Sequence, residues 1–192
     1  MNNRIGKPIL LLVLGIATLV SAAYSQEEKQ KPEAYSAVAM GTGGGVGGKT
    51  IPFDFSISRY TSDEELNKFA QLLKEKGQDA LRSALEKEDV GRISPTGRVG
   101  NQIAVARKRQ EGTVTVITIV TARTMPFIEL YRSNRSTDYP FGFLQVKLNS
   151  KGEGSGQIMA AASIRFNKKK GHYEIESYGN QYIKAVNVRL WK

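Results

Sequence analysis

The sequence predicts a mainly β fold: an antiparallel sandwich or barrel of about eight strands, with a short helical pair inserted after the second strand. Two observations predict it. Apolar residues recur at every second position through most of the chain after residue 34, which is the period of a half-buried strand. That spacing changes only once, over residues 62–88, to the three-to-four period of an amphipathic helix. Because no helical pattern separates the later strands, a parallel doubly wound sheet is not expected.

Two strands are predicted before the helices. Residues 34–40 form the first, and a glycine-rich stretch follows it over residues 41–48. In the second strand, Phe53, Phe55 and Ile57 alternate with polar side chains, so the two aromatic rings are expected on the core face.

The helical pair has clear boundaries in the sequence. Ser62 and Glu65 form a capping box, and three consecutive carboxylates stand where the helix dipole favours negative charge. Gly77 ends this helix and a second one begins directly after it. The apolar side of the pair is formed by Leu66, Phe69, Ala70, Leu73, Ala80, Leu81, Ala84 and Leu85.

The rest of the chain predicts strands separated by short turns. Residues 149–156 are expected to be a turn, and Gly179-Asn180 is a two-residue hairpin signal before the last strand. The strands are expected near residues 103–107, 114–119, 141–148, 158–166, 173–177 and 182–191. The expected core residues here are Phe141, Phe143, Tyr182, Ile183, Val186, Val188 and Trp191.

Composition excludes several classes of chemistry. The 192 residues include no cysteine and one histidine, so disulfide scaffolds, iron–sulfur clusters, thiolate zinc sites and sites with several imidazoles are ruled out. We therefore expect no cofactor and no metal site. With 40% hydrophobic and 24% charged residues, the chain has the composition of an ordinary folded protein.

The N-terminus predicts export. Residues 1–25 combine a basic start, a twelve-residue apolar run and small residues, which is the order of a secretory signal peptide, with cleavage after Ala23 or Ser25. An uncleaved anchor is the alternative, although the apolar run is short for a membrane span. Cleavage removes Arg4, Lys7 and no acidic residue, so the net charge falls from +10 to +8. We expect a secreted or periplasmic protein without a transmembrane span after cleavage, with a flexible lead over residues 26–33 and a single β-rich domain over residues 34–192.

Several segments resemble a family of secreted bacterial proteins of unknown function. They are residues 60–66 (YTSDEEL), 76–81 (KGQDAL), 138–141 (DYPF) and 152–154 (GEG). The resemblance spans most of the mature chain and implies export and a single domain. Since the family has no established activity, it implies no functional residue.

Residues 43–50 match the nucleotide-binding Walker A pattern letter by letter, ending in Lys49-Thr50. A phosphate-binding loop joins a strand to a helix, whereas the element expected next here is a strand. We interpret the segment as an inter-strand loop and do not expect nucleotide binding. Nucleic acid is not an expected partner either, because few aromatic residues accompany the basic ones.

Three sets of residues are candidate surface sites. Two basic clusters at predicted hairpin turns would form a patch for an anionic envelope polymer if both lie at one end of the sheet; they are Arg107, Lys108 and Arg109, and Lys168, Lys169 and Lys170. A long polar loop offers a candidate site for a polar ligand, because functional residues are often carried on loops; its residues are Arg132, Arg135, Asp138 and Tyr139.

No motif identifies a catalytic residue. His172 stands at a predicted turn in a sequence without a Gly-x-Ser-x-Gly elbow, and we interpret it as solvated. The carboxylates outside the helices that could serve a hydrolase are Asp54, Glu129, Glu174 and Glu176. The leading hypothesis is an exported, non-enzymatic envelope or extracellular protein with a binding or structural role. The alternatives are a lipocalin-like carrier of a small apolar or amphipathic ligand and a carboxylate hydrolase.

Overall fold

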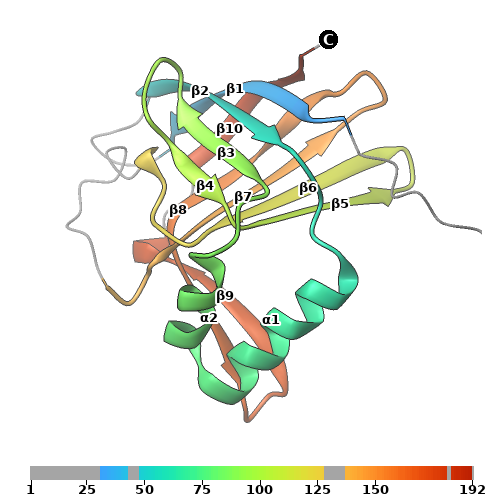
Figure 1. The fold of residues 1–192 in the computed structure, drawn as a ribbon. Helices are drawn as coiled ribbons and strands as arrows, with labels where there is room; N and C mark the ends of the chain where they lie inside the picture. Colours follow the sequence, from blue (N-terminus) through green and yellow to red (C-terminus); the bar gives the residue numbers. More distant parts are fainter. Residues whose placement is uncertain (1–30, 43–47, 128–136, 181–182, 192) are drawn as a thin grey trace, which may run out of the picture.

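One antiparallel sheet of ten strands makes up most of the fold (Figure 1). The computed structural model describes residues 31–42, 48–127, 137–180 and 183–191, so the predicted signal peptide lies outside the described residues. The strands are β1 (Glu33–Gly41), β2 (Thr50–Ile57), β3 (Gly91–Pro95), β4 (Asn101–Ile103), β5 (Val105–Glu111), β6 (Val114–Thr121), β7 (Phe141–Leu148), β8 (Glu153–Asn167), β9 (His172–Ser177) and β10 (Ile183–Leu190).

The sheet curls into a nearly closed barrel. Its order is β4-β3-β2-β1-β10-β8-β7-β6-β5, with β9 paired to β8. The two outermost strands, β4 and β5, are consecutive in the chain and are separated only by Ala104, whose N–H donates to Val120 O at 2.9 Å. On the other side of β5, the Thr61 N–H donates to Ala106 O at 2.8 Å, and the Thr61 hydroxyl accepts from the Ala106 N–H at 3.1 Å. These contacts close the seam, and the predicted mainly β class is confirmed.

The interior of the barrel is filled by apolar side chains. Alternation along β2 buries Phe53, Phe55 and Ile57, each at most 2% exposed, as the sequence predicts. The Phe53 ring lies 4.9 Å from that of Phe127, and the Phe55 ring stacks at 4.7 Å on that of Tyr35. Contacts of this kind leave the lining of the described interior almost inaccessible to water.

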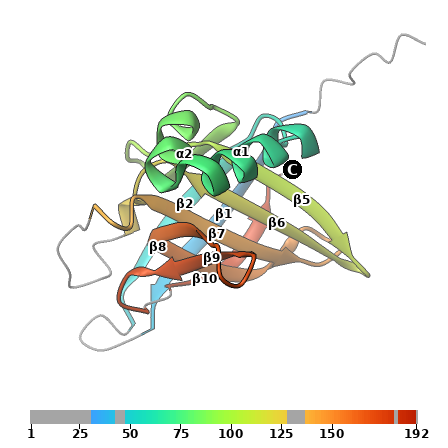
Figure 2. The same ribbon diagram turned by 90° about the horizontal axis from the view of Figure 1, so that it is seen from below.

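A second apolar cluster fixes the helices to the outside of the barrel. Helices α1 (Asp63–Lys76) and α2 (Gln78–Leu85) lie across the outer face of β5–β8 at one end of the molecule (Figure 2). The predicted capping box is present: the Glu65 N–H donates to Ser62 Oγ at 3.2 Å, and the Ser62 N–H donates to Glu65 Oε2 at 2.8 Å. The buried members of this cluster are Leu73, Leu81, Leu85, Ala104, Val105, Val120, Ala122, Phe141, Phe143 and Ala162.

The predicted hairpin at Gly179-Asn180 is wrong. A short 3₁₀ segment, η3 (Tyr178–Asn180), follows β9, and β9 and β10 do not pair with each other among the described residues. Instead, the two strands pair with different parts of β8, β9 with residues 162–167 and β10 with residues 153–158. The 15-residue β8 is long enough to bind two partners in succession, so the chain crosses between them rather than turning back.

Two further expectations near the C-terminus are corrected. Val186 and Val188 do not share a face: Val188 is buried and Val186 is half-buried, because β10 contains a bulge around Asn187, whose φ is 52°. Trp191 is 61% exposed rather than in the core, since it lies beyond the last residue of β10. Tyr182 lies outside the described residues.

The turn expected over residues 149–156 is shorter than predicted, because β8 already begins at Glu153. Gly154 and Gly156, which suggested a turn, are instead strand residues that face the backbone of β7. A Cβ atom at Gly154 would lie 1.9 Å from Lys147 O, and one at Gly156 would lie 2.1 Å from Gln145 O. Glycine at these positions therefore permits close approach of two strands.

Candidate functional site

The two basic clusters named in the sequence lie on different parts of the molecule. Arg107, Lys108 and Arg109 are residues of strand β5 and not of a turn, which corrects the prediction for this cluster. Lys168–Lys170 form the turn between β8 and β9, as predicted. Figure 1 shows the β5–β6 hairpin at the side of the barrel and the β8–β9 hairpin beside the helices, so the clusters do not merge into one patch.

The first cluster is engaged in ion pairs. Arg107 contacts Asp63 at 2.6 Å, Lys108 contacts Glu33 at 2.7 Å, and Arg109 contacts Glu111 at 2.6 Å. Each positive charge is therefore partly balanced by a carboxylate of this chain, which leaves little attraction for an external anion.

The second cluster adjoins a basic groove of about 450 Å³ between α1 and the β8–β9 hairpin. Leu73, which is buried, and Phe166, which is half-buried, provide its apolar surface. Its only carboxylate is Glu75, whose Oε1 accepts from Gln71 Nε2 at 2.8 Å. Its cationic side chains are Lys74, Lys76, Arg165 and Lys168. We call this recess the basic groove.

The cations of the basic groove come from two segments of the chain, the end of α1 and the end of β8. Lys74 and Lys76 occupy the last turn of α1, where the helix dipole favours positive charge. Arg165 and Lys168 come from the C-terminal end of β8 and the turn that follows. Lys76, Arg165 and Lys168 have no side-chain hydrogen bond or ion pair among the described residues, so their charge is available to a ligand.

The walls of the basic groove are held together by hydrogen bonds between the helices and the sheet. Gln78 Oε1 accepts from the Ile164 N–H of β8 at 3.0 Å, and Gln78 Nε2 donates to Asp138 O at 3.1 Å. The Tyr173 hydroxyl donates to Ala70 O of α1 at 3.1 Å. Because these contacts connect α1, α2 and β9, the groove is a preformed feature of the surface.

Aromatic side chains lie next to the cations. Tyr173 is 46% exposed, and its ring centroid lies 5.0 Å from that of Phe166. Lys74 Nζ lies 5.4 Å from the centroid of the Phe166 ring. The groove thus combines positive charge with apolar surface, which suits a ligand that carries anionic groups on a partly apolar framework.

The polar loop is described only in part. Arg132 and Arg135 lie outside the described residues. Asp138 is exposed, and the half-buried Tyr139 contacts Tyr178 edge to face, with 5.3 Å between their ring centroids. The binding role proposed for this loop stays a prediction.

The candidate catalytic carboxylates do not form a pair with free acceptors in the described chain. Asp54 of β2 accepts from the Thr96 hydroxyl at 2.8 Å. Glu174 of β9 accepts from Asn167 and contacts Lys170 and His172, and Glu176 lies on the same strand, far from β2 (Figure 1). Glu129 lies outside the described residues. No three His, Cys, Asp or Glu side chains gather within the described ranges in a way that could hold a metal ion.

Gly43–Gly47 of the Walker-like segment also lie outside the described residues. Lys49 is exposed, and Thr50 is the first residue of strand β2. The expectation that a strand follows the motif is confirmed, and the helix N-terminus that a phosphate-binding loop requires is replaced by that strand.

A second recess lies at the opposite end of the barrel, with a volume of about 800 Å³. Tyr35 and Leu148, each 2% exposed, close it toward the interior. Glu33 is the centre of a hydrogen-bonded cluster at this recess: its Oε2 accepts from the hydroxyls of Tyr35 at 2.5 Å and Tyr60 at 2.7 Å, and its Oε1 contacts Lys108 at 2.7 Å. The cluster connects β1 to β5 across the seam.

This cluster shifts the pKa values of its members. Burial raises the pKa of Glu33, but hydrogen bonds from Lys108, Tyr35 and Tyr60 outweigh that effect, so the pKa is lowered. Burial, followed by the hydrogen bond to Glu33, raises the pKa of both tyrosines well above their ordinary value of 10.0. The Glu33 contribution to stability is present above its unfolded pKa and is lost as pH falls through its lowered folded pKa. The tyrosine contribution is present below about pH 10 and is lost as pH rises through the raised folded values.

We expect Glu33→Gln to reduce both of these pH dependences, because it removes the titrating carboxylate and its charged hydrogen bonds to the tyrosines. The measurement is the free energy of unfolding by urea between pH 3 and 11. Glu153→Gln, an exposed change at the same recess, is the control and should follow the unmodified protein. If the two variants show the same pH profile, the cluster does not stabilise the closed seam.

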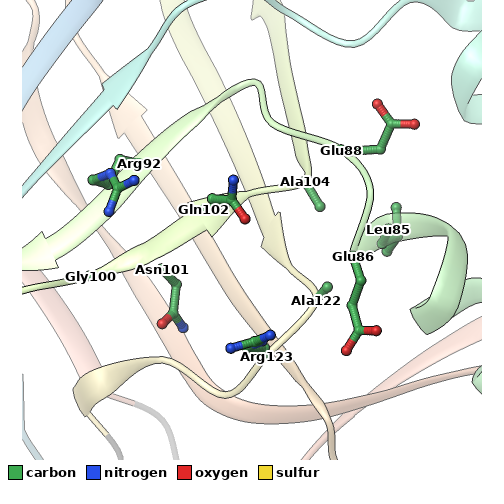
Figure 3. Close-up of a pocket in the computed structure, with 10 residues that line it drawn as sticks. All are labelled: Leu85, Glu86, Glu88, Arg92, Gly100, Asn101, Gln102, Ala104, Ala122 and Arg123. Carbon is green, nitrogen blue, oxygen red and sulfur yellow. The ribbon is translucent and has the colours of Figure 1, made fainter.

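The third recess is a pocket of about 210 Å³ at the seam, where the end of α2 meets β3, β4 and the end of β6 (Figure 3). Sequence reasoning identified none of its polar residues, because they come from four separate segments and each is unremarkable alone. The same applies to Lys74, Lys76 and Arg165 of the basic groove, although the basic last turn of α1 is a signal that could have indicated them.

No family model, no curated protein and no solved structure matches this chain. The resemblance to secreted bacterial proteins therefore stays a prediction from the sequence segments. None of the described helices has the length and apolar character needed to cross a membrane.

Proposed function

We propose that this protein is exported and acts outside the cytoplasm as a non-enzymatic binding protein for an anionic envelope polymer, with the basic groove as its binding site. The observation that carries the proposal is the convergence of four cationic side chains, from α1, β8 and the β8–β9 turn, around an apolar floor with one carboxylate. The predicted signal peptide and the excess of basic residues support it.

The groove suits an extended ligand better than a small isolated ion. Its volume of about 450 Å³ is open to the surface beside the exposed Tyr173 ring and the Lys168–Lys170 turn, so successive units of a polymer have cations and apolar surface to contact. Exposed charge pairs each contribute about 0–1 kcal/mol and are screened by salt. Useful affinity therefore requires several contacts along one chain, which a polymer provides.

The test uses mature protein recovered from the exported fraction. Its intact mass, measured by mass spectrometry, is expected to match a chain that begins at Tyr24 or Gln26. Binding to polygalacturonate, an anionic polysaccharide, is measured by titration in about 50 mM salt, with neutral dextran as the comparison. We expect Lys76→Glu with Lys168→Glu to weaken binding by about tenfold or more, because two attractions become repulsions. Raising the salt concentration should weaken binding of the unmodified protein.

The matched control is Lys147→Glu with Lys184→Glu, which changes the net charge equally on exposed positions of β7 and β10. It should bind nearly as well as the unmodified protein. Equal losses in both double variants would show that total charge, and not the basic groove, governs binding, and would contradict the proposed site.

The second candidate function is a carrier of a small apolar or amphipathic ligand, which the barrel-like sheet supports. A carrier function inside the barrel requires space that the interior side chains now occupy. Phe53, Phe127 and Leu144 of the interior cluster are fully buried, so an interior ligand would have to displace side chains that now fill the barrel. The basic groove requires no such rearrangement, and for that reason we favour it.

A further inference from the structure

The seam pocket has positive and negative charge on opposite walls (Figure 3). Arg92, Asn101, Gln102 and Arg123 stand on the sheet side, and Glu86 and Glu88 follow the end of α2 on the other side. Among the described residues, neither Arg92 nor Arg123 forms an ion pair with Glu86 or Glu88, which contact Arg82 and Arg59 instead. The charges therefore face a shared space without neutralising each other directly.

Both pocket arginines have unused hydrogen-bonding capacity. Arg92 and Arg123 have no side-chain hydrogen bond or ion pair among the described residues. Elsewhere in the described chain, Arg59, Arg82 and Arg107 each contact a carboxylate. A guanidinium presents five N–H donors in a planar fork that matches a carboxylate, so two unpaired guanidiniums at one pocket favour a carboxylate-bearing ligand.

Each pocket carboxamide uses one of its two N–H donors within the protein and keeps its oxygen as an acceptor. Asn101 Nδ2 donates to Thr124 O at 2.7 Å, which leaves Asn101 Oδ1 as an acceptor. Gln102 Nε2 donates to Asp89 Oδ2 at 3.0 Å, which leaves Gln102 Oε1. These bonds also fix the orientation of each amide group.

The glutamates are positioned by exposed ion pairs that leave them further acceptor capacity. Glu86 Oε1 contacts Arg82 at 3.2 Å, and Glu88 Oε2 contacts Arg59 at 3.5 Å. An ionised carboxylate has about four acceptor positions, so one contact does not saturate it. An ammonium or N–H group of a ligand can therefore bind on this side.

Part of the pocket lining is small and apolar. Leu85, Ala104 and Ala122 are buried and line it without polar atoms in their side chains. The volume of about 210 Å³ corresponds to roughly seven water molecules in the liquid. That space fits a molecule of one or two amino-acid units and not a polymer.

We propose that the seam pocket binds a small zwitterion, an α-amino acid or a dipeptide, with its carboxylate at Arg92 and Arg123 and its ammonium toward Glu86 and Glu88. This site is separate from the basic groove, and its ligand class is different. The proposal therefore does not depend on polymer binding, and either can fail without the other.

The test is calorimetric titration of the full mature chain with alanine and with alanyl-alanine at up to about 10 mM. Two capped forms of the dipeptide, one N-acetylated and one with a C-terminal amide, separate the two charges. We expect the uncapped ligand to bind and each cap to weaken binding by about 10–100-fold, because each removes a charged hydrogen bond. Comparison of alanine with alanyl-alanine distinguishes a free amino acid from a peptide as the ligand.

Arg92→Gln and Arg123→Gln should each weaken binding by a similar factor, and Arg123→Lys should recover part of the loss by restoring the charge. Arg98→Gln, an exposed arginine in the β3–β4 turn outside the pocket, is the matched control and should leave binding unchanged. The changed side chains are exposed, and thermal unfolding of each variant checks that the fold is retained. The proposal would be overturned if neither alanine nor alanyl-alanine binds. It would also be overturned if the capped dipeptides bind as tightly as alanyl-alanine, or if both glutamine variants bind as tightly as the unmodified protein.

Discussion

Gly91→Ala is expected to destabilise the protein by about 3–5 kcal/mol, because alanine meets both backbone strain and a steric clash there. Gly91 has a φ of 156°, a conformation that residues with a side chain rarely adopt. It pairs with Ile57 in the β2–β3 ladder, and a Cβ atom would lie 2.0 Å from Ser56 O. Relief of this contact requires the two strands to separate at the point where the chain returns from α2.

The measurement is the free energy of unfolding by urea, with Gly112→Ala as the control. Gly112 also has a positive φ, of 59°, but nothing lies within 4 Å of the Cβ position in the β5–β6 turn. The control should therefore lose only about 1–2 kcal/mol from backbone strain. Equal losses would show that the contact with Ser56 O adds nothing to the effect of the backbone angle.

Phe53→Ala is expected to cost about 3–5 kcal/mol and to lower the melting temperature by roughly 10 °C, because it opens a cavity in a filled interior. Phe53 is fully buried, and its ring contacts those of Phe55 and Phe127, with centroid distances of 6.2 and 4.9 Å. Thermal unfolding followed by circular dichroism measures the change.

Trp191→Ala is the control, because it removes a larger aromatic ring that is 61% exposed, and it should change stability by no more than about 0.5 kcal/mol. A loss below about 1 kcal/mol for Phe53→Ala would contradict close packing around this ring. Such a result would favour a hollow barrel and the carrier function over the basic groove. The experiment therefore bears on function as well as stability.

Local rules predicted most elements of the fold. The capping box at Ser62 and Glu65, the helix end at Gly77 and the alternation of Phe53 with Phe55 each depend on residues a few positions apart. These signals act within one helical turn or one strand. They can therefore be recognised without knowing which strands pair.

The errors occurred where pairing between distant strands decides the outcome. A bulge at Asn187 changes the face of the sheet on which the later side chains lie. A strict alternation of core and surface residues through this bulge therefore places Val186 on the wrong face. The hairpin predicted at Gly179 failed because β8 binds both β9 and β10. Nothing in the C-terminal residues alone indicates that β8 is long enough to do so.

The candidate sites were less predictable than the fold. Lys168–Lys170 were recognised as a cluster because they are contiguous, whereas Lys74 and Lys76 join Lys168 only after α1 is placed beside β8. Arg92 and Arg123 are separated by three strands in the chain and line the same pocket only because the sheet closes on itself. Binding sites assembled by closure of a barrel have no local sequence signature.

The pairing of the first strand with the last determines which face of the protein is exposed when the chain is immobilised on a sensor surface. Tyr35 is opposite Leu190 in the β1–β10 ladder, and the Trp191 N–H donates to Ala34 O at 2.8 Å. The C-terminal end of the chain lies on the side of the barrel away from α1, α2 and β9 (Figure 1). Immobilisation through a tag at either terminus should therefore present the same face to the solution, with Lys76 and Lys168 accessible to polymers flowing over a sensor surface.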